Sequence, residues 1–417
     1  MSYAAIIVTI GDELLIGQTI DTNSAWIAQH LNKLGINVTR RIAIADTQEA
    51  IAAMLDESIP MARLVILTGG LGPTADDVTK PALNNYFGGN MVVNETVLEH
   101  VRQIFAKRNR PFLEANLKQA EVPDACTVLF NRMGTAPGMW FEKGDTIIVS
   151  LPGVPFEMET IMTEEALPRI QALFKGNYMV HKTLVTAGVG ESFLAEKIKD
   201  IETALPKEIH LAYLPGLGFV KLRLTGESAD GQALQSSIAT HSQLLVQRLG
   251  NVVASEEDET LANIVAKKLL EHRLTFGTAE SCTGGYLGSL LTNIAGSSAF
   301  YKGSVVGYAN ETKEAVLKVS AQTLETEGAV SEATVIQMAE HARSLLCTDI
   351  AVATSGILGP DGGTAHKPVG TVWMAVSNGK RTVAKLHQFH YDRLRNKEMA
   401  ANAAFNLVRL FIEANYG

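Results

Sequence analysis

Apolar runs of strand length alternate with segments of helical periodicity through residues 1–172 of this 417-residue chain. Residues 4–9, 36–44 and 63–68 are expected to be buried strands, while residues 26–34 carry apolar side chains at helical spacing. This order favours right-handed β-α-β units, and therefore a parallel sheet covered by helices on both faces. The sequence thus predicts a three-layer α/β/α fold for its first part.

The length of the chain exceeds what one hydrophobic core usually supports, so several domains are expected. The pattern predicts the α/β domain over residues 1–172, a small α+β domain over residues 177–253, and a second α/β domain over residues 257–417. Residues 253–258 are interpreted as a linker, in which Ser255 begins a capping box for the next helix.

The composition of the chain limits which kinds of molecule it is expected to bind and in which compartment. A net charge of −8 argues against a nucleic-acid-binding surface as the main function, because phosphate backbones are bound by clustered lysine and arginine. The three scattered cysteines fit a reducing cytoplasm better than a disulfide framework. Without a basic leader or 18 consecutive apolar residues, the sequence predicts neither a signal peptide nor a membrane span.

A serine lies at a predicted strand-to-helix turn in residues 279–285, Ala-Glu-Ser-Cys-Thr-Gly-Gly. Ser281 is a candidate nucleophile there, and the backbone amides of Thr283, Gly284 and Gly285 are candidate oxyanion donors. The alternative is a simple helix cap, in which the hydroxyl satisfies free amides. Cys282 is intrinsically the better nucleophile, but a small thiol packed behind the turn is the ordinary interpretation.

Tyr308 and Lys313, further along the chain, are candidates for the proton carrier that a serine nucleophile requires. A lysine whose pKa is lowered by burial can act as a base, and so can a tyrosine.

A glycine-rich, acidic loop follows the third predicted strand, where open α/β sheets collect ligands. Its candidate substrate-binding residues are Gly69, Gly70, Gly72 and Thr74, because backbone amides can approach phosphate oxygens closely. Asp76 and Asp77 are candidate ligands for a divalent cation that would neutralise a pyrophosphate. In the alternative interpretation, the two aspartates only cap the helix that follows.

Five ordered motifs in the last part of the chain resemble the CinA C-terminal family, the nicotinamide-mononucleotide amidohydrolases. They are the serine turn, Ala295-Gly-Ser-Ser-Ala-Phe300, Tyr308-x-Asn310-x-x-Lys313, Gly328-Ala-Val-Ser-Glu332, and Ser355-Gly-Ile-x-Gly-Pro-x-Gly-Gly363 with Lys367-Pro-Val-Gly-Thr371.

The resemblance implies that Ser281 carries the chemistry without a cofactor, and that Arg393 binds the phosphate of the substrate. The match near that arginine is loose by about one residue, so Arg395 remains an alternative. Leu358 departs from the small residue that the family usually has at this position.

Motifs of the first part resemble the molybdopterin-binding-like domain of CinA proteins. They are Gly11-Asp-Glu-Leu-Leu-x-Gly17, Asp21-Thr-Asn-Ser24, the glycine-rich loop, Lys118-Gln-Ala120, Asn131-x-x-Gly-Thr-Ala-Pro-Gly138 and Leu151-Pro-Gly-Val-Pro-x-Glu-Met158. In that family this domain is associated with ADP-ribose pyrophosphatase activity, which depends on a divalent metal ion such as Mg²⁺, Mn²⁺ or Co²⁺. Proteins of the family also carry a small middle domain where residues 177–253 lie, and the resemblance suggests a homodimer.

Together these features predict a cytoplasmic hydrolase of pyridine-nucleotide salvage with two substrates, nicotinamide mononucleotide and ADP-ribose. One alternative treats the N-terminal domain as a non-catalytic molybdopterin- or nucleotide-binding module, because the same fold serves binding in other proteins. Another treats the chain as an interaction protein of DNA uptake or damage response.

Overall fold

The computed structural model of the chain describes residues 3–74, 76–174 and 178–417. It divides into two compact units: residues 1–180 with 226–236, and residues 181–225 with 237–417. Most of the predicted middle domain therefore shares a unit with the predicted C-terminal domain. None of the helices in the described ranges is long and apolar enough to cross a membrane.

The first unit is built on a six-stranded sheet with the order β2-β1-β3-β8-β7-β6. Strands β2, β1, β3 and β8 are parallel, whereas β7 and β6 run antiparallel at one edge. Their bounds are β1 Tyr3–Ile10, β2 Ile36–Ile44, β3 Leu64–Thr68, β6 Thr127–Leu129, β7 Gly138–Lys143 and β8 Thr146–Leu151.

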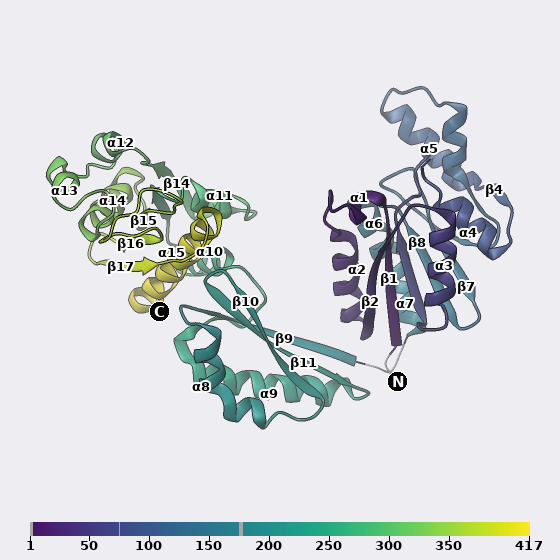
Figure 1. The fold of residues 1–417 in the computed structure, drawn as a ribbon, viewed down its shortest axis with the longest axis horizontal. Coiled ribbons are helices and arrows are strands. Elements are labelled where there is room, and N and C mark those ends of the chain that lie inside the picture. The colour runs from purple at the N-terminus through teal and green to yellow at the C-terminus, as the bar shows by residue number, and fades with distance from the viewer. Residues whose placement is uncertain (1–2, 75, 175–177) are drawn as a thin grey trace. The chain divides into compact units, whose positions relative to one another are not determined.

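Helices cover both faces of this sheet (Figure 1). Helix α2 (Thr22–Lys33), α6 (Pro155–Ile161) and α7 (Leu167–Leu173) pack on one face, where Ile27 and Leu31 are buried four residues apart. Helix α3 (Gln48–Ser58) packs on the other face through Ile51 and Leu55, and α4 (Thr79–Phe87) through Ala82 and Leu83. Because apolar residues at this spacing form one helix face, the predicted three-layer α/β/α architecture is confirmed.

A lateral lobe of this unit, not predicted from the sequence, has its own small core. It contains β4 (Met91–Val93), α5 (Glu95–Lys107), a 3-10 helix (Glu114–Ala120) and β5 (Glu121–Pro123).

The middle segment forms a four-stranded sheet with the order β10-β11-β9-β12 and two helices, α8 (Glu191–Thr203) and α9 (Gly231–Leu249). The strands are β9 (Tyr178–Ala187), β10 (Ile209–Gly216), β11 (Phe219–Ser228) and β12 (Val253–Ser255). Every second residue of β11 is buried, as the predicted alternation requires.

The predicted linker is wrong at its start. Val253–Ser255 is strand β12, which pairs antiparallel with β9 and completes the middle sheet. The capping box is also wrong, because helix α10 (Leu261–Glu271) is capped by Thr260, which accepts a hydrogen bond from the amide of Asn263. The Ser255 hydroxyl instead donates to Glu259.

The C-terminal part contains a five-stranded sheet with the order β14-β13-β15-β16-β17, in which the first three strands are parallel. The strands are β13 (Phe276–Glu280), β14 (Tyr301–Val306), β15 (Ile350–Gly356), β16 (Thr371–Ser377) and β17 (Thr382–Gln388). Helices α10, α11 (Tyr286–Thr292) and α15 (Arg393–Tyr416) pack on one face, and α14 (Glu332–Leu345) on the other (Figure 1). This arrangement places the carboxyl end of β13, and with it Ser281, between the parallel strands β14 and β15.

Candidate functional site

The serine turn is fixed to the sheet at the end of β13. The Ser281 amide donates to the Thr354 carbonyl of the neighbouring strand β15 over 2.9 Å, and the Ser281 residue is only 7% exposed. Gly284 and Gly285 have φ values of 62° and 90°, a left-handed backbone that glycine adopts without strain. These two glycines let the chain reverse directly into α11, so the predicted strand–turn–helix geometry is present.

A buried carboxylate that the sequence analysis did not single out anchors this turn. The side chain of Glu280 is fully buried and accepts hydrogen bonds from the amides of Leu287 and Gly288, at 3.0 and 2.9 Å. The Ser304 hydroxyl donates to the same carboxylate over 3.1 Å. An acidic residue suits the first turn of a helix, where free amides carry partial positive charge. An acid at the end of an apolar strand, just before a helix, is the signal that could have identified it.

The three predicted oxyanion donors differ in their surroundings. The Gly284 amide donates to the Ser281 carbonyl over 3.1 Å and is therefore directed into the turn. Thr283 is fully buried, and its hydroxyl lies 2.8 Å from that of Thr354. The amides of Thr283 and Gly285 are thus the better candidates to stabilise a developing negative charge.

Lys313 is brought to the same cavity by the short helix α12 (Asn310–Ala315), which follows β14. It is 1% exposed, and its ammonium donates to the Tyr308 carbonyl over 2.9 Å. Burial lowers the pKa of this lysine below its usual value of 10.5. A buried lysine with a lowered pKa can exist in the neutral form that a general base requires.

The cavity that joins these residues measures about 180 Å³ and is lined by Ser281, Cys282, Tyr308, Asn310, Lys313, Ala329, Val330, Ser355, Gly356, Leu358 and Arg393. Leu358, the departure from the family motif, is buried in this wall. The residues come from five separate segments that meet beyond the carboxyl ends of the parallel strands, as expected for an α/β sheet.

Of the two predicted arginines, Arg393 lines this cavity. Its guanidinium donates to the Gly359 carbonyl over 2.7 Å and to the Tyr308 hydroxyl over 3.1 Å. Arg395 instead pairs with Asp392 at 3.2 Å, with a largely exposed side chain. The geometry therefore favours Arg393 as the anion-binding residue.

Cys282 lies in the wall of the cavity but is poorly suited to react. It is buried, and burial raises the pKa of its thiol to about 12. The thiolate, not the thiol, is the nucleophilic form, so this cysteine is protonated at neutral pH.

In the first unit, Asp77 organises the glycine-rich loop. Its carboxylate accepts hydrogen bonds from the amides of Gly72 and Thr74, each at 2.8 Å, and from the Thr74 hydroxyl. The next helix, α4, begins at Thr79 without a side-chain cap, so capping by the aspartates is not observed. Asp76 is exposed on the surface of the same loop.

Gly69 and Gly70 have φ values of 124° and 63°, and a Cβ atom there would meet the Ile10 carbonyl oxygen or the Thr79 hydroxyl, so the fold of the loop itself requires both glycines. The Gly72 amide, by contrast, is directed to Asp77.

A further acid in this region, Asp46, escaped the sequence analysis. It follows β2, whose carboxyl end lies at the same edge of the sheet as that of β3, so the edge rule applied to β2 could have found it. Burial, together with the nearby charges of Asp77 and Asp12, raises the pKa of Asp46 to about 6. Its Oδ1 is buried and has no hydrogen-bond partner among the described residues.

This acidic edge does not form a complete metal site. In the described part of the chain, no three His, Cys, Asp or Glu side chains are grouped so that they could hold a metal ion. A divalent cation such as Mg²⁺ commonly uses only one or two carboxylates and takes water and phosphate oxygens as its other ligands. The orphaned oxygen and the raised pKa of Asp46 fit such a partial site.

Comparison with known proteins divides the chain into three matching regions. Residues 6–172 match the family described as "Probable molybdopterin binding domain", residues 181–253 the "Damage-inducible protein CinA KH domain", and residues 258–412 the "CinA C-terminal domain".

Curated relatives match the chain over nearly its whole length. A CinA-like protein from Cytophaga hutchinsonii is 46% identical and aligns over 97% of both chains. One from Flavobacterium psychrophilum is 43% identical over 99% of both. A crystal structure of a CinA superfamily protein from Klebsiella pneumoniae, 36% identical, covers 37% of this chain and 96% of its own, with a TM-score of 0.36.

Proposed function

Because the chain belongs to the CinA family, we propose that its C-terminal part hydrolyses the carboxamide of nicotinamide mononucleotide to nicotinate mononucleotide and ammonia. The observation that carries this proposal is the cavity in which Ser281 and the buried Lys313 both lie, with Arg393 in its wall. This set supplies a nucleophile, a base and an anion-binding group.

In the proposed reaction, Ser281 Oγ attacks the carboxamide carbon while neutral Lys313 accepts its proton. The amides of Thr283 and Gly285 stabilise the oxyanion of the tetrahedral intermediate. The C–N bond then breaks, the proton passes from Lys313 to the leaving nitrogen, and ammonia departs. Water hydrolyses the resulting ester of Ser281 by the same proton route, which releases the carboxylate and restores the enzyme.

The dimensions of the cavity support this assignment. A volume of about 180 Å³ suits the pyridine ring and its carboxamide but leaves little room for the ribose phosphate. The phosphate would then lie towards Arg393, whose planar guanidinium can hold phosphate oxygens in a bidentate pair.

Replacing Arg393 by alanine is therefore expected to raise the KM for nicotinamide mononucleotide by about tenfold or more, because a charge-assisted phosphate contact is lost. Arg395→Ala is the matched control and should change KM little, since Arg395 pairs with Asp392. Steady-state kinetics of ammonia release would measure both. If Arg395→Ala raised KM more than Arg393→Ala did, the assignment of phosphate binding to Arg393 would be wrong.

For the N-terminal part, we propose metal-dependent cleavage of the pyrophosphate of ADP-ribose. The acidic edge supports this, because Asp46 carries an unpartnered buried oxygen beside Asp77. One or two of the carboxylates of Asp46, Asp76 and Asp77 would hold the cation together with water and phosphate oxygens, with Gly69, Gly70 and Thr74 near the phosphates. The metal would supply charge neutralisation at the pyrophosphate oxygens. A non-catalytic nucleotide-binding module is the second candidate, since Asp77 already satisfies the amides of its own loop.

Excess chelator should separate the two activities. AMP formation from ADP-ribose is expected to fall to background, whereas ammonia release should continue, because backbone amides stabilise its single oxyanion. Asp77→Ala should likewise remove AMP formation and spare ammonia release, with Asp76→Ala giving the same or a weaker loss. If the metal-supplemented protein binds ADP-ribose but never cleaves it, the binding-module assignment replaces this proposal.

We also propose that the protein works as a cytoplasmic homodimer. The free cysteines Cys126, Cys282 and Cys347 support a reducing compartment, and the CinA resemblance supports the dimer. Sedimentation equilibrium of the purified chain would test the oligomeric state.

A further inference from the structure

A cavity of about 390 Å³ lies within the second unit, where loops of the middle sheet meet strand β17 and helix α15. Its apolar wall includes Phe219 of β11, Phe389 just after β17, and Met399, Leu407 and Leu410 of α15. Concave, mostly apolar cavities of this size accommodate small organic ligands. We call this space the β17–α15 cavity.

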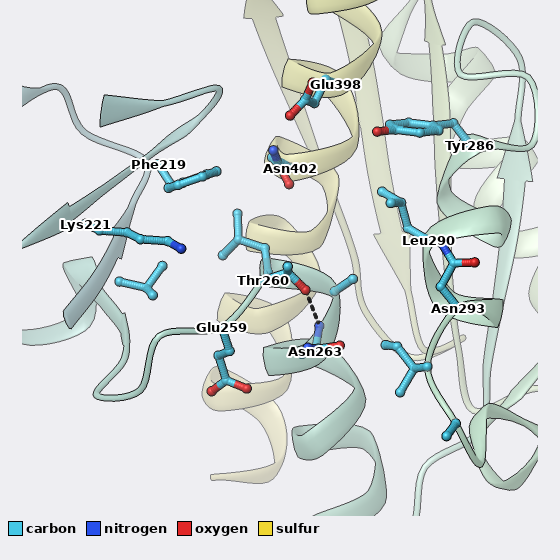
Figure 2. A pocket seen from close by; sticks show the side chains of 15 residues that line it. Phe219, Lys221, Glu259, Thr260, Asn263, Tyr286, Leu290, Asn293, Glu398 and Asn402 are labelled. Atoms are coloured by element: carbon cyan, nitrogen blue, oxygen red, sulfur yellow. Dashed lines mark hydrogen bonds between the residues drawn. The ribbon is translucent and has the colours of Figure 1, made fainter. Parts of the chain in front are cut away.

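The β17–α15 cavity is distinct from a neighbouring one of about 620 Å³. Phe219 lines both, and Figure 2 shows it in the neighbouring cavity beside Lys221 and opposite Tyr286. The lysine of that cavity, Lys221, pairs with Asp258 at 2.5 Å. In the β17–α15 cavity, by contrast, the Lys385 ammonium has no ion pair or hydrogen bond among the residues that the structure describes. Its positive charge is therefore available to a ligand.

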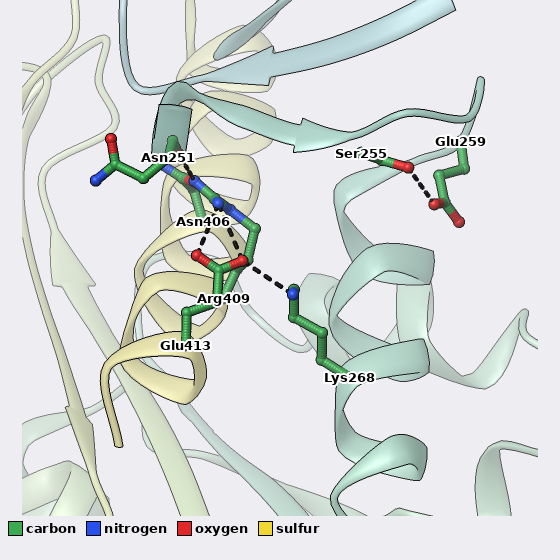
Figure 3. Close-up of polar contacts among 7 residues, drawn as sticks. All are labelled: Asn251, Ser255, Glu259, Lys268, Asn406, Arg409 and Glu413. Carbon is green, nitrogen blue, oxygen red and sulfur yellow. Dashed lines mark hydrogen bonds and ion pairs between the residues drawn. The ribbon is translucent and has the colours of Figure 1, made fainter. Parts of the chain in front are cut away.

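A buried carboxamide in the wall carries free hydrogen-bond donors. Asn406 of α15 is 7% exposed, and its Oδ1 accepts hydrogen bonds from Nε and Nη2 of Arg409, at 3.0 and 2.8 Å (Figure 3). Because an arginine side chain can only donate, this contact fixes which end of the carboxamide faces Arg409. The Nδ2 group lies beside Gly188 of the cavity wall and has no acceptor in the described part of the chain.

The surrounding network holds this carboxamide in place (Figure 3). Arg409 is 1% exposed and donates to the Asn251 carbonyl, just before β12, over 2.9 Å. It also pairs with Glu413 at 3.0 Å, and Lys268 of α10 contacts the same carboxylate at 2.9 Å. A donor that is already oriented in the empty site loses little entropy when a ligand binds to it.

His387 of β17 adds a second polar atom without a partner. Its ring stacks on that of Phe389 with centroids 5.5 Å apart, and its Nε2 is buried with no hydrogen bond to any described residue. Burial, with the nearby charge of Lys385, lowers the pKa of His387 to about 4. The ring is therefore neutral at pH 7, and a neutral imidazole can carry its proton on Nε2 and donate it. A ligand oxygen that accepts this hydrogen bond would remove the cost of leaving the atom unsatisfied.

The start of helix α8 borders the same cavity. Gly190 precedes this helix and supplies no side-chain cap, so the first amides of α8 lack a side-chain acceptor. The N-terminal end of a helix also favours negative charge. Glu191 is the only acid among the described residues that line the cavity, and it is exposed to solvent. The polar groups of the wall are thus mainly donors.

We propose that the β17–α15 cavity binds a small apolar monocarboxylate of the arylalkanoate class, with its carboxylate held by Asn406 Nδ2, His387 Nε2 and the Lys385 ammonium. An ionised carboxylate only accepts hydrogen bonds, which matches a wall of donors. One lysine and a neutral histidine match a single negative charge. The apolar body would lie against Phe219, Met399 and the other apolar side chains of the wall.

Isothermal titration of the full chain with 3-phenylpropanoate and its neutral counterpart 3-phenylpropan-1-ol tests this proposal. The carboxylate is expected to bind about tenfold more tightly or better, because charge-assisted hydrogen bonds are stronger than neutral ones. Asn406→Asp should remove this preference, since it keeps an oxygen for Arg409 but loses both N–H donors. His387→Phe, which retains the stack on Phe389, and Lys385→Met should each weaken the carboxylate and change the alcohol little.

Two further variants are matched controls. Lys380 lies in the turn between β16 and β17 and outside the cavity, so Lys380→Met should leave binding unchanged. Arg393→Ala should also leave it unchanged, which distinguishes this site from the cavity at Ser281. Equal affinity for the acid and the alcohol, insensitivity to both His387→Phe and Lys385→Met, or loss of binding with Arg393→Ala would each overturn the proposal. These outcomes decide it even if Asn406→Asp does not fold, and none depends on amidase activity.

Discussion

Replacing Ser281 by alanine is expected to lower turnover of nicotinamide mononucleotide by about a thousandfold or more, because the chemistry then lacks its nucleophile. The change removes one oxygen atom from a residue that the backbone holds in place through Thr354, so the fold should be retained. Ammonia release would measure the loss. AMP formation from ADP-ribose in the same sample would show that the first unit is intact.

Cys282→Ala is the matched control for this experiment. The thiol is buried and, with a pKa of about 12, protonated at neutral pH, so its loss should change turnover by less than about threefold. A small buried side chain replaced by a smaller one leaves only a minor cavity. If the cysteine variant is inactive and the serine variant active, the nucleophile has been assigned to the wrong residue.

The layered architecture was predictable because its signals are local. Apolar residues at helical spacing, such as Ile27 and Leu31, identify a buried helix face, and strand-length apolar runs identify the parallel strands. The turn at Ser281 was predictable for the same reason, since two adjacent glycines shortly after a strand allow the left-handed backbone that a tight turn into a helix uses.

The polar interior was not predictable, because its contacts join residues far apart in sequence. Glu280 binds the first turn of α11 and also Ser304, and Arg409 reaches the carbonyl of Asn251. No periodicity marks such pairs, and each side chain alone suggests a solvated surface residue.

The predicted linker and helix cap near residues 253–260 are wrong because two sequence patterns overlap there. Residues 253–258 resemble a linker because their acidic segment suggests the start of a helix. A three-residue strand carries almost no pattern of its own, and only the free edge of β9 explains its pairing. The sequence pattern does not identify Thr260 as the cap of α10, because Ser255 matches the capping-box pattern earlier in the chain.

Lys313→Met should reduce kcat by about a thousandfold while changing KM by less than about threefold, because a proton carrier acts mainly in the transition state. Methionine occupies a similar volume and keeps the apolar contacts of the lysine stem. Tyr308→Phe should behave similarly if the tyrosine hydroxyl takes part in proton transfer. A large rise in KM with unchanged kcat would show that these residues only bind substrate.

The pH profile separates a base from a structural lysine. Burial lowers the pKa of Lys313 in the folded protein below 10.5, so the unfolded chain binds more protons between the two values. This lysine therefore makes the folded state less stable at pH values below its folded pKa, and stability recovers as pH rises towards 10.5. In Lys313→Met both this stability slope and the acid limb of kcat/KM should disappear, because the neutral amine that carries the reaction is gone. An acid limb that survives the substitution would belong to another group, and Lys313 would then lose its role as the base.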